Sequence, residues 1–290
     1  MGNTKTKAER KLHHVREAGA QWATSKGPLA SYAYEFLVFG IKQGWACLFG
    51  GLMCFLLLLT AFFYPEDAPL ARYDFLVLAA VIIQIVLLAT GMETKDEAIV
   101  ILIYHIVGTI MEIFKTQAGS WIYPEESVLR IGAVPLFSGF MYAAVGSYIA
   151  RVWRLFDFQF TYYPRALLTW LLAIAIYINF FSHHFILDIR YFLFAATALV
   201  FLKTFVHFRT DVVYRSMPLL VGFFLVSLFI WFTENIGTYA RAWAYPGQEN
   251  RWHMVSIAKL GSWYLLMVIS FVLVSLVNPV KAGLSHRENR

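Results

Sequence analysis

Long apolar runs alternate with short polar connections along most of the chain. Each run is close to the length of about 20 residues that an α-helix needs to cross a bilayer core about 30 Å thick. The pattern therefore predicts an all-α integral membrane protein with eight transmembrane helices. The predicted spans cover residues 44–63, 72–92, 97–115, 133–150, 166–182, 188–206, 217–233 and 256–278.

A shorter apolar segment, Tyr34 to Gln43, comes before the first predicted span and contains Glu35 and Lys42. Charged residues are costly inside the hydrocarbon core but are accommodated at its surface. We therefore expect this segment to form a helix that lies in the membrane interface.

Composition agrees with a membrane protein. Hydrophobic residues make up 59% of the chain and charged residues 14%, which leaves too little polar surface to cover a soluble globule of this size. The first 33 residues are basic and lack an early apolar core. This segment therefore resembles a cytoplasmic tail and not a cleavable signal peptide.

The distribution of Lys and Arg predicts the orientation of the chain. Connections on the side of the N-terminal tail carry more basic residues than those on the opposite side. We therefore expect a multi-pass protein of the cell inner (plasma) membrane with both termini in the cytoplasm, as an even number of spans requires. The predicted organisation is a tail at 1–33, four-helix repeats at 34–152 and 153–279, and a tail at 280–290.

Two stretches of the chain resemble each other, "MEIFKTQAGSWIYPE" at 111–125 and "TENIGTYARAWAYPG" at 233–247. A shift of 122 residues aligns them and also aligns the helices on either side. Because the shift spans an even number of helices, it predicts two parallel copies of a four-helix unit. The pairs within the motif are Glu112 and Glu234, Thr116 and Thr238, Trp121 and Trp243, and Tyr123 and Tyr245.

Parallel copies are related by an axis along the membrane normal, so Glu112 and Glu234 are predicted to face each other on the non-cytoplasmic side. A carboxylate near the end of an apolar helix is costly in lipid and usually has a function. Burial and the negative end of the helix dipole both favour its protonated form. The glutamates are therefore candidate catalytic residues. Candidate substrate contacts are Trp121, Tyr123, Trp243, Tyr245, Thr116 and Thr238.

These residues also have a structural interpretation. Trp and Tyr gather at membrane interfaces, where both aromatic pairs would form part of a belt. Each glutamate could also accept a hydrogen bond from a motif tyrosine or a threonine and take no part in chemistry.

His105 precedes Glu112 by seven residues, which places both on one face of the same predicted helix about two turns apart. This spacing suits a proton relay with Thr109 between them, so His105 is a third candidate catalytic residue. The alternative is a buried histidine bonded to a neighbouring carbonyl. The second copy has Ser227 in place of His105. The two halves therefore differ chemically, and we expect Glu112 to be the better proton donor.

Histidines also occur in the outer connections, where His183, His184, Asp188 and His253 suggest a zinc site. No compact ligand motif such as HExxH occurs, and adjacent histidines are expected to point in different directions. We therefore expect these loop histidines to be solvated and no metal to bind. Phosphate-binding loops and nucleophile elbows are also absent, so no cofactor is predicted.

The stretch "MEIFKTQAGSWIYPE" and the following "LRIGAVPLFSGFMYAAVGSYIARVW" resemble the signature region of carotenoid hydratases and the small-subunit type of lycopene cyclase. The resemblance implies acid chemistry on a polyene. The chain as a whole also resembles a family of bacterial multi-pass membrane proteins that has no assigned function. The positions that match the carotenoid signature are Glu112, Gly119, Tyr123, Gly132, Pro135 and Leu136.

The leading hypothesis is an enzyme in which Glu112 and Glu234 protonate or deprotonate an apolar lipid or isoprenoid in a lipid-accessible cavity. The alternatives are a proton-coupled transporter that uses the paired glutamates and a zinc-dependent lipid hydrolase. The expected partners are the bilayer and an apolar small molecule, with no nucleic acid, and a homo-oligomer stays open. A cavity open sideways to lipid would favour the enzyme, and access along the membrane normal would favour the transporter.

Overall fold

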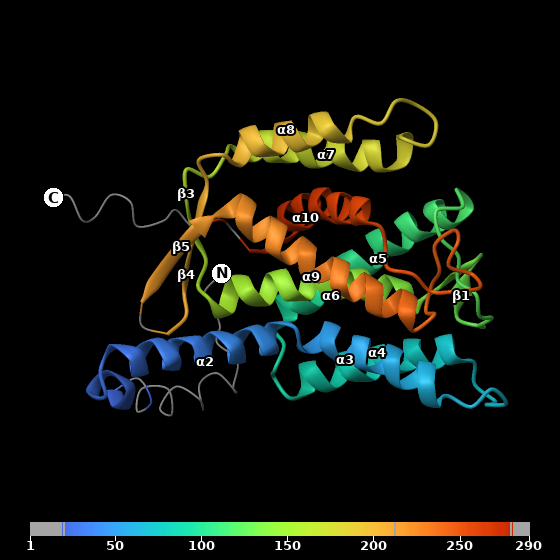
Figure 1. Cartoon of the computed structure of the whole chain (residues 1–290), viewed down its shortest axis with the longest axis horizontal. Helices are drawn as coiled ribbons and strands as arrows, with labels where there is room; N and C mark the ends of the chain where they lie inside the picture. Colours follow the sequence, from blue (N-terminus) through green and yellow to red (C-terminus); the bar gives the residue numbers. More distant parts are fainter. Residues whose placement is uncertain (1–18, 20, 212, 279, 281–290) are drawn as a thin grey trace.

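A computed structural model of the protein describes residues 19, 21–211, 213–278 and 280, and most of them are helical (Figure 1). The helices are α2 (Pro28–Ala46), α3 (Leu48–Phe63), α4 (Arg72–Ala89), α5 (Lys95–Gln117), α6 (Phe137–Leu155), α7 (Ala166–Ser182), α8 (Arg190–Phe201), α9 (Leu219–Tyr239) and α10 (Ile257–Val277). The strands are β1 (Arg130–Ile131), β2 (Val134–Pro135), β3 (Gln159–Thr161), β4 (Phe205–Arg209) and β5 (Tyr214–Pro218).

Four of the described helices, α4, α5, α9 and α10, are long and apolar enough to cross a membrane. Helices α2 and α3 together would make a fifth span, but the pair is bent by 67° around Cys47. The chain is therefore a multi-pass membrane protein. Helices α7 and α8 are apolar but have only 17 and 12 residues, so helix length supports fewer spans than the eight predicted.

The first predicted elements are placed differently from expectation. Helix α2 begins at Pro28, within the predicted tail, and extends to Ala46, so the predicted interfacial helix is longer than expected and takes the first residues of the predicted span. Most of the N-terminal tail and nearly all of the C-terminal tail lie outside the described residues.

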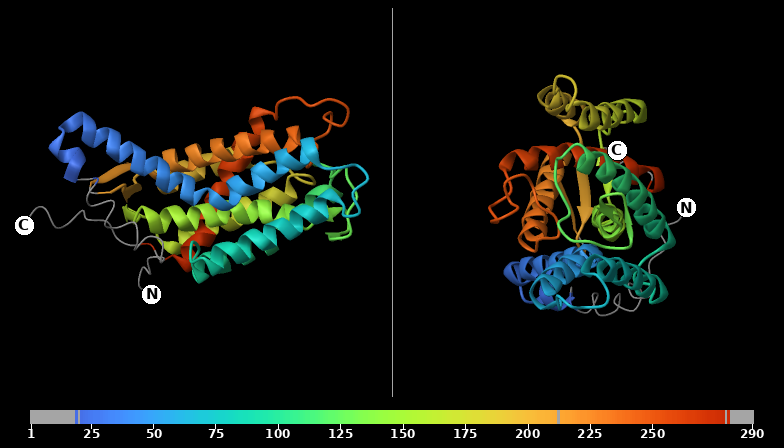
Figure 2. Two further views of the ribbon diagram at one scale, coloured as in Figure 1. Left: turned by 90° about the horizontal axis from the view of Figure 1, so that it is seen from below. Right: turned by 90° about the vertical axis from the view of Figure 1, so that its right-hand side faces the viewer.

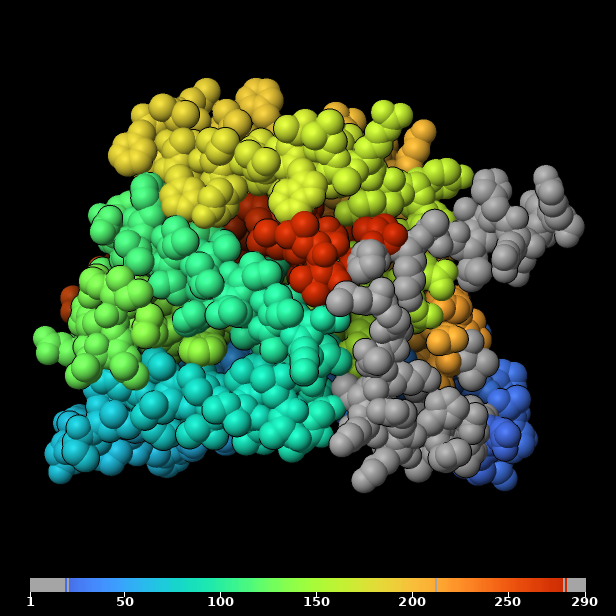
Figure 3. Space-filling view, turned by 180° about the vertical axis from the view of Figure 1, so that it is seen from behind, coloured from blue at the N-terminus to red at the C-terminus, as the bar shows by residue number. Residues whose placement is uncertain are grey.

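The helices run roughly along the long axis of the molecule in three groups (Figures 1 and 2). Helices α2, α3 and α4 lie on one side and the α7–α8 pair on the other, with α5, α6, α9 and α10 between them. From behind, α10 is visible between the α7–α8 pair and α5 (Figure 3). Helix α6 contacts α2, α3, α4, α5 and α10, and this central position accounts for the charged residues in its sequence.

Helices α5 and α6 approach each other closely because glycines face tyrosines. A Cβ on Gly108 would lie 2.6 Å from Tyr142 Cβ, and one on Gly146 would lie 2.6 Å from Tyr104 Cδ2. Small residues allow such contacts in a membrane, where helix association depends on close packing. Gly108 therefore makes room for Tyr142 of α6, and Gly146 for Tyr104 of α5, between the two helices.

The prediction of an all-α protein missed a small antiparallel sheet. Strand β4 pairs with β3 on one side and with β5 on the other, and the sheet closes one end of the bundle (Figure 1). The predicted helix 188–206 instead ends at Phe201, because the aromatic and β-branched run "FVHFR" favours a strand.

Candidate functional site

Helices α5 and α9 end in the same way at the end of the bundle opposite the sheet. The residue after each C-cap has a positive φ, 68° at Gly119 and 53° at Arg241. Its N–H donates to a carbonyl three residues back, that of Thr116 or Thr238, at 3.1 Å in both cases. Glycine adopts this conformation freely, whereas arginine does so at a cost. The chain therefore leaves both helices through the same type of turn.

The loops that follow these turns meet. Ile122 and Ala244 form an antiparallel bridge in which each N–H donates to the other residue's carbonyl at 2.9 Å. The aromatic residues of both motifs flank this bridge in the sequence. The bridge therefore joins the two stretches that the sequence repeat had paired.

Glu112 is almost completely buried, with 3% of its surface exposed. Its Oε2 accepts a hydrogen bond from Trp121 Nε1 at 2.7 Å and another from the Tyr123 hydroxyl at 2.7 Å. The tyrosine contact is the one expected from the structural interpretation of the motif. The tryptophan contact was not foreseen.

Glu234 repeats this arrangement on α9. Its Oε1 accepts a hydrogen bond from Trp243 Nε1 at 2.9 Å and a short one from the Tyr245 hydroxyl. It is buried as well. Both glutamates are therefore held by one indole and one phenol from the loop that follows their own helix.

The loop tyrosines act as donors in this arrangement. Burial, followed by the adjacent Glu112 carboxyl, raises the pKa of Tyr123 well above its usual range. Burial, followed by Glu234, raises the pKa of Tyr245 in the same way. Because both phenols keep their protons, each can donate a hydrogen bond continuously to its glutamate.

The two predicted threonine contacts are turned away from this site. Thr116 Oγ1 donates to the Glu112 carbonyl at 2.8 Å, and Thr238 Oγ1 donates to the Glu234 carbonyl at 3.1 Å. Neither threonine lines the adjoining cavity. They satisfy the backbone one turn before the end of each helix.

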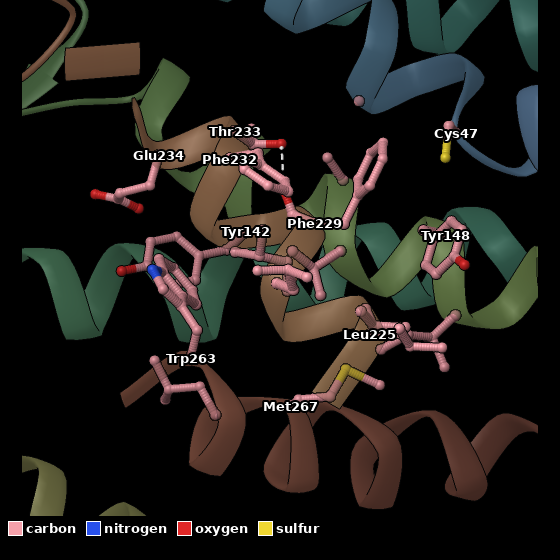
Figure 4. Close-up of a pocket in the computed structure, with 18 of the residues that line it drawn as sticks. Cys47, Tyr142, Tyr148, Leu225, Phe229, Phe232, Thr233, Glu234, Trp263 and Met267 are labelled. Carbon is pink, nitrogen blue, oxygen red and sulfur yellow. Dashed lines mark hydrogen bonds between the residues drawn. The ribbon is translucent and has the colours of Figure 1, made fainter. Parts of the chain in front are cut away.

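Both glutamates and the four motif aromatics line one elongated cavity of about 900 Å³. Figure 4 shows Glu234 and Trp263 at one end and Tyr148 and Cys47 at the other, with Phe229 between them. Helix α9 lines the cavity from Leu219 to Glu234, and these 16 residues correspond to about 24 Å of helix. The cavity is thus long, polar at the glutamate end and apolar along most of its length.

The cavity reaches the outside of the bundle through the wall formed by α9. Leu225, Phe229 and Phe232 line it and are 50%, 63% and 52% exposed, respectively. Gly51 of α3 also lines the cavity and is exposed. In a membrane this seam between α3 and α9 would face lipid, so the cavity opens sideways.

Lys259, which was not predicted from the sequence, lies in the first turn of α10 and lines the cavity. Its Nζ lies 4.1 Å from the ring centre of Tyr245 and 5.1 Å from that of Trp121, so it contacts both motif copies. Tyr142 and Trp263 were missed too, although they interact with Glu112 and Glu234 respectively. A lysine at the start of a long apolar run was the available signal, because charged residues within spans usually have a function.

His105 is placed apart from the glutamates. Its ring packs on Phe140 at 4.4 Å between ring centres and lies against Gly139 of α6. His105 does not line the cavity, and among the described residues no hydrogen bond joins its ring to Glu112. The Thr109 hydroxyl donates to the His105 carbonyl at 2.7 Å and does not bridge to Glu112. The structure therefore does not join these residues into a relay.

The histidines between α7 and α8 contact a lysine. Lys115 Nζ lies 2.8 Å from His184 Nε2 and 3.5 Å from His183 Nε2, so the adjacent rings face the same group, contrary to expectation. Asp188 interacts instead with Arg190. The described residues contain no group of three or more His, Cys, Asp or Glu that could hold a metal ion.

His253 lies in the other loop, where its Nδ1 is 3.3 Å from the Met254 carbonyl. The four residues named for the zinc alternative are therefore held by different partners. The ring nitrogens of His183 and His184 converge on the ammonium group of Lys115 and not on a metal ligand.

Membrane-length helices around an apolar cavity with buried carboxylates define a class of protein: a multi-pass membrane protein with a polar site inside the bundle. More particularly, residues 35–271 match the model of the DUF817 family, described as proteins of unknown function, and the chain belongs to that family. It is similar to the uncharacterized protein YoaT of Bacillus subtilis (strain 168), with 40% identity over 247 residues, or 85% of this chain and 93% of that protein. No solved structure matches the chain.

Proposed function

We propose that this protein is an intramembrane enzyme that carries out acid–base chemistry on a long apolar substrate of the lipid or isoprenoid class. One observation carries the proposal. Two buried glutamates line the polar end of an elongated cavity that opens sideways between α3 and α9. A bilayer-soluble molecule could enter such a cavity without passing through water, which favours an enzyme over a transporter.

The chemistry follows from the surroundings of the carboxyl groups. A neutral carboxylic acid in an apolar pocket can donate its proton to a carbon–carbon double bond. The O–H bond breaks as a C–H bond forms, which leaves a carboxylate and a carbocation-like centre. The second glutamate, as a carboxylate, then removes a proton from the adjacent carbon and restores a double bond. With water as a second reactant, the same first step leads to hydration.

The aromatic residues suit a positively charged intermediate. Trp121, Trp243, Tyr123 and Tyr245 line the cavity beside the glutamates. Aromatic faces attract cations, most strongly where water is excluded. In the proposed reaction these rings would lower the energy of the carbocation-like centre without reacting with it.

The proposal includes a duplicated architecture. The same hydrogen bonds at Glu112 and Glu234, and the same turn at Gly119 and Arg241, support two parallel four-helix units related by the shift of 122 residues. Such units would give eight passes with both chain ends on the cytoplasmic side, and would put the glutamates on the opposite side. In Figure 1, α2 begins and α10 ends at the sheet end of the bundle, which agrees with this plan.

The resemblance to carotenoid hydratases and lycopene cyclases makes a polyene the first substrate class to test. Glu112 and Tyr123, two of the matching positions, are hydrogen-bonded to each other at the cavity. Gly119 and Gly132, two further matches, both have positive φ, of 68° and 60°. The matching residues thus include two that line the cavity and two that set the backbone conformation of the loop.

The test compares lipid and pigment profiles of host cells by mass spectrometry. The strains carry the wild-type protein, a deletion, or the double variant Glu112→Gln with Glu234→Gln at matched expression. We expect one apolar species to accumulate in both altered strains. A double variant with the wild-type profile, in a host where the deletion changes that profile, would contradict the proposal. The variant Thr116→Ser serves as a matched control, because Thr116 does not line the cavity.

One observation favours a second candidate, a proton-coupled transporter. The bent pair α2–α3 breaks at Cys47, and Cys47 and Gly50 line the cavity. Interrupted helices beside a central site are common in transporters. Proton uptake into proteoliposomes that depends on an added solute and on Glu112 would favour this candidate. Unchanged lipid profiles in every strain would point the same way.

A further inference from the structure

The two motif copies differ in the residue that covers the tyrosine. The shift of 122 residues pairs Lys259 with Phe137. In the first copy, Phe137 packs edge-on against Tyr123, with ring centres 6.0 Å apart and an interplanar angle of 89°. In the second copy, the ammonium of Lys259 lies 4.1 Å from the ring centre of Tyr245. An otherwise matched pair of sites is therefore neutral on one side and positively charged on the other.

Lys259 is the only Lys, Arg or His among the described residues that line the cavity. Lys115 lies on the same helix as Glu112, but its ammonium faces His183 and His184. Arg190 of α8 interacts with Asp188. The titratable or charged groups around the glutamates are Lys115 on α5, Tyr142 on α6, Lys259 on α10, Tyr123 and Tyr245 in the motif loops, and His183, His184, Asp188 and Arg190 beside α7 and α8.

Lys259 acts unequally on the two glutamates. Its ammonium lies closer to the ring of Tyr245, whose hydroxyl donates to Glu234, than to the ring of Trp121, whose indole donates to Glu112. Both glutamates lie within the reach of its charge. A nearby positive charge favours the ionised form of a carboxyl group, most strongly where water is excluded.

We propose that Lys259 divides the roles of the two glutamates, holding Glu234 as the carboxylate and leaving Glu112 as the protonated donor. Lys259 is a positioning residue in this scheme, because it acts through Glu234 and does not itself transfer a proton. The inference rests on the proposed acid–base function and specifies its direction. Glu112 gives its proton to the substrate carbon, Glu234 takes one from the neighbouring carbon, and Lys259 keeps its charge throughout.

The experiment measures protonation directly and needs no substrate. Infrared difference spectroscopy of the purified protein in lipid nanodiscs follows the C=O band of protonated carboxyl groups during a pH titration. In the wild type we expect a band that persists to the highest pH and that Glu112→Gln removes, whereas Glu234→Gln leaves it in place. In Lys259→Phe, which copies the first motif, Glu234 should titrate about one pH unit or more higher than in the wild type.

Two further variants guard against a folding defect. Lys259→Arg keeps the charge and should leave both titrations unchanged, whereas Lys259→Met removes the charge with an unbranched side chain and should reproduce Lys259→Phe. Equal titration of both glutamates in the wild type would overturn the inference, as would an unshifted Glu234 in folded Lys259→Phe and Lys259→Met. Because no turnover is measured, the expected titrations combined with an unchanged lipid profile would reject the proposed enzyme and leave the role of Lys259 standing.

Discussion

Buried charge occurs at both ends of the helix bundle but is organised in different ways. Toward the sheet end, Arg151 donates to Glu93 at 2.8 Å and has its Nε 3.8 Å from Glu97 Oε2, and its side chain is fully buried. At the opposite end, Glu112 and Glu234 are held by neutral donors and have no Lys or Arg nitrogen within salt-bridge distance among the described residues.

The ion pairs of Arg151 have a structural role, whereas Glu112 and Glu234 are available for chemistry. Arg151 and Arg154 of α6 balance the charges of Glu93 and Glu97, and these ion pairs link α6 to the chain around the start of α5. Neutral donors orient Glu112 and Glu234, and neither glutamate forms an ion pair with a described Lys or Arg. A carboxyl group in that setting can exchange a proton with whatever enters the cavity, and this availability is what acid–base chemistry requires.

The largest effect on stability should follow from Arg151→Met. Removing one partner of a buried ion pair leaves the other uncompensated and costs about 3–5 kcal/mol. We expect a large drop in thermal stability in detergent, followed by fluorescence-detected size exclusion. The double variant Arg151→Met with Glu93→Gln should recover part of the loss. If Arg151→Met alone were as stable as the wild type, the ion pairs of Arg151 would have no structural role.

A smaller loss is expected from Trp121→Phe, which keeps the aromatic volume but removes the indole donor to Glu112. Glu112 keeps its hydrogen bond from Tyr123, so the variant loses one of two hydrogen bonds, which costs about 0.5–1.5 kcal/mol. The same thermal assay should give a similar loss for Trp243→Phe, because the contacts match. Widely different losses for the two variants would contradict the matched geometry of the motifs.

Glu112→Gln should change stability least among variants of buried residues at the site. The amide oxygen can still accept the hydrogen bonds from Trp121 and Tyr123, so we expect a loss of no more than about 1 kcal/mol. Proton donation, in contrast, should be abolished. The check compares the thermal assay with the lipid profile. A loss of stability as large as that of Arg151→Met would make Glu112 a structural residue too.

The smallest effect concerns the loop between α7 and α8, beyond both buried clusters. Burial, followed by the nearby Lys115 charge, lowers the pKa of His184. As pH falls through the unfolded value of about 6.5, the unfolded chain binds more protons than the folded one, so stability decreases. His184→Gln should flatten this part of the curve of melting temperature against pH, with His253→Gln as the matched control. An unchanged slope in His184→Gln would refute the assignment.

The sequence predicted most helices because apolar runs and polar connections are local signals. It predicted the bounds of α7 but could not predict where α8 ends, the bend at Cys47 or the sheet, because these depend on how segments pack. Helix α6 shows the reason most clearly. Other helices surround it, so its arginines form ion pairs inside the protein. Its low hydropathy therefore does not show that it lies at the centre of the bundle.

The candidate site was partly predictable because two stretches of the sequence resemble each other. The shift of 122 residues named the glutamates and four aromatic residues, and the structure places all six around one cavity. The shift did not identify Lys259, because it aligns this residue with Phe137 and the two do not match. His105 illustrates the opposite error, since spacing along one helix does not show which neighbouring helix the ring will face.

The chain contains two cysteines, Cys47 and Cys54, and both lie in the wall of the cavity. They are unpaired thiols on either side of the seam residues Gly50 and Gly51. The reactivity of these two native thiols can therefore report whether the cavity is occupied. An apolar thiol reagent should label the empty protein and be blocked when the cavity is filled, which allows candidate substrates to be ranked without any engineered label.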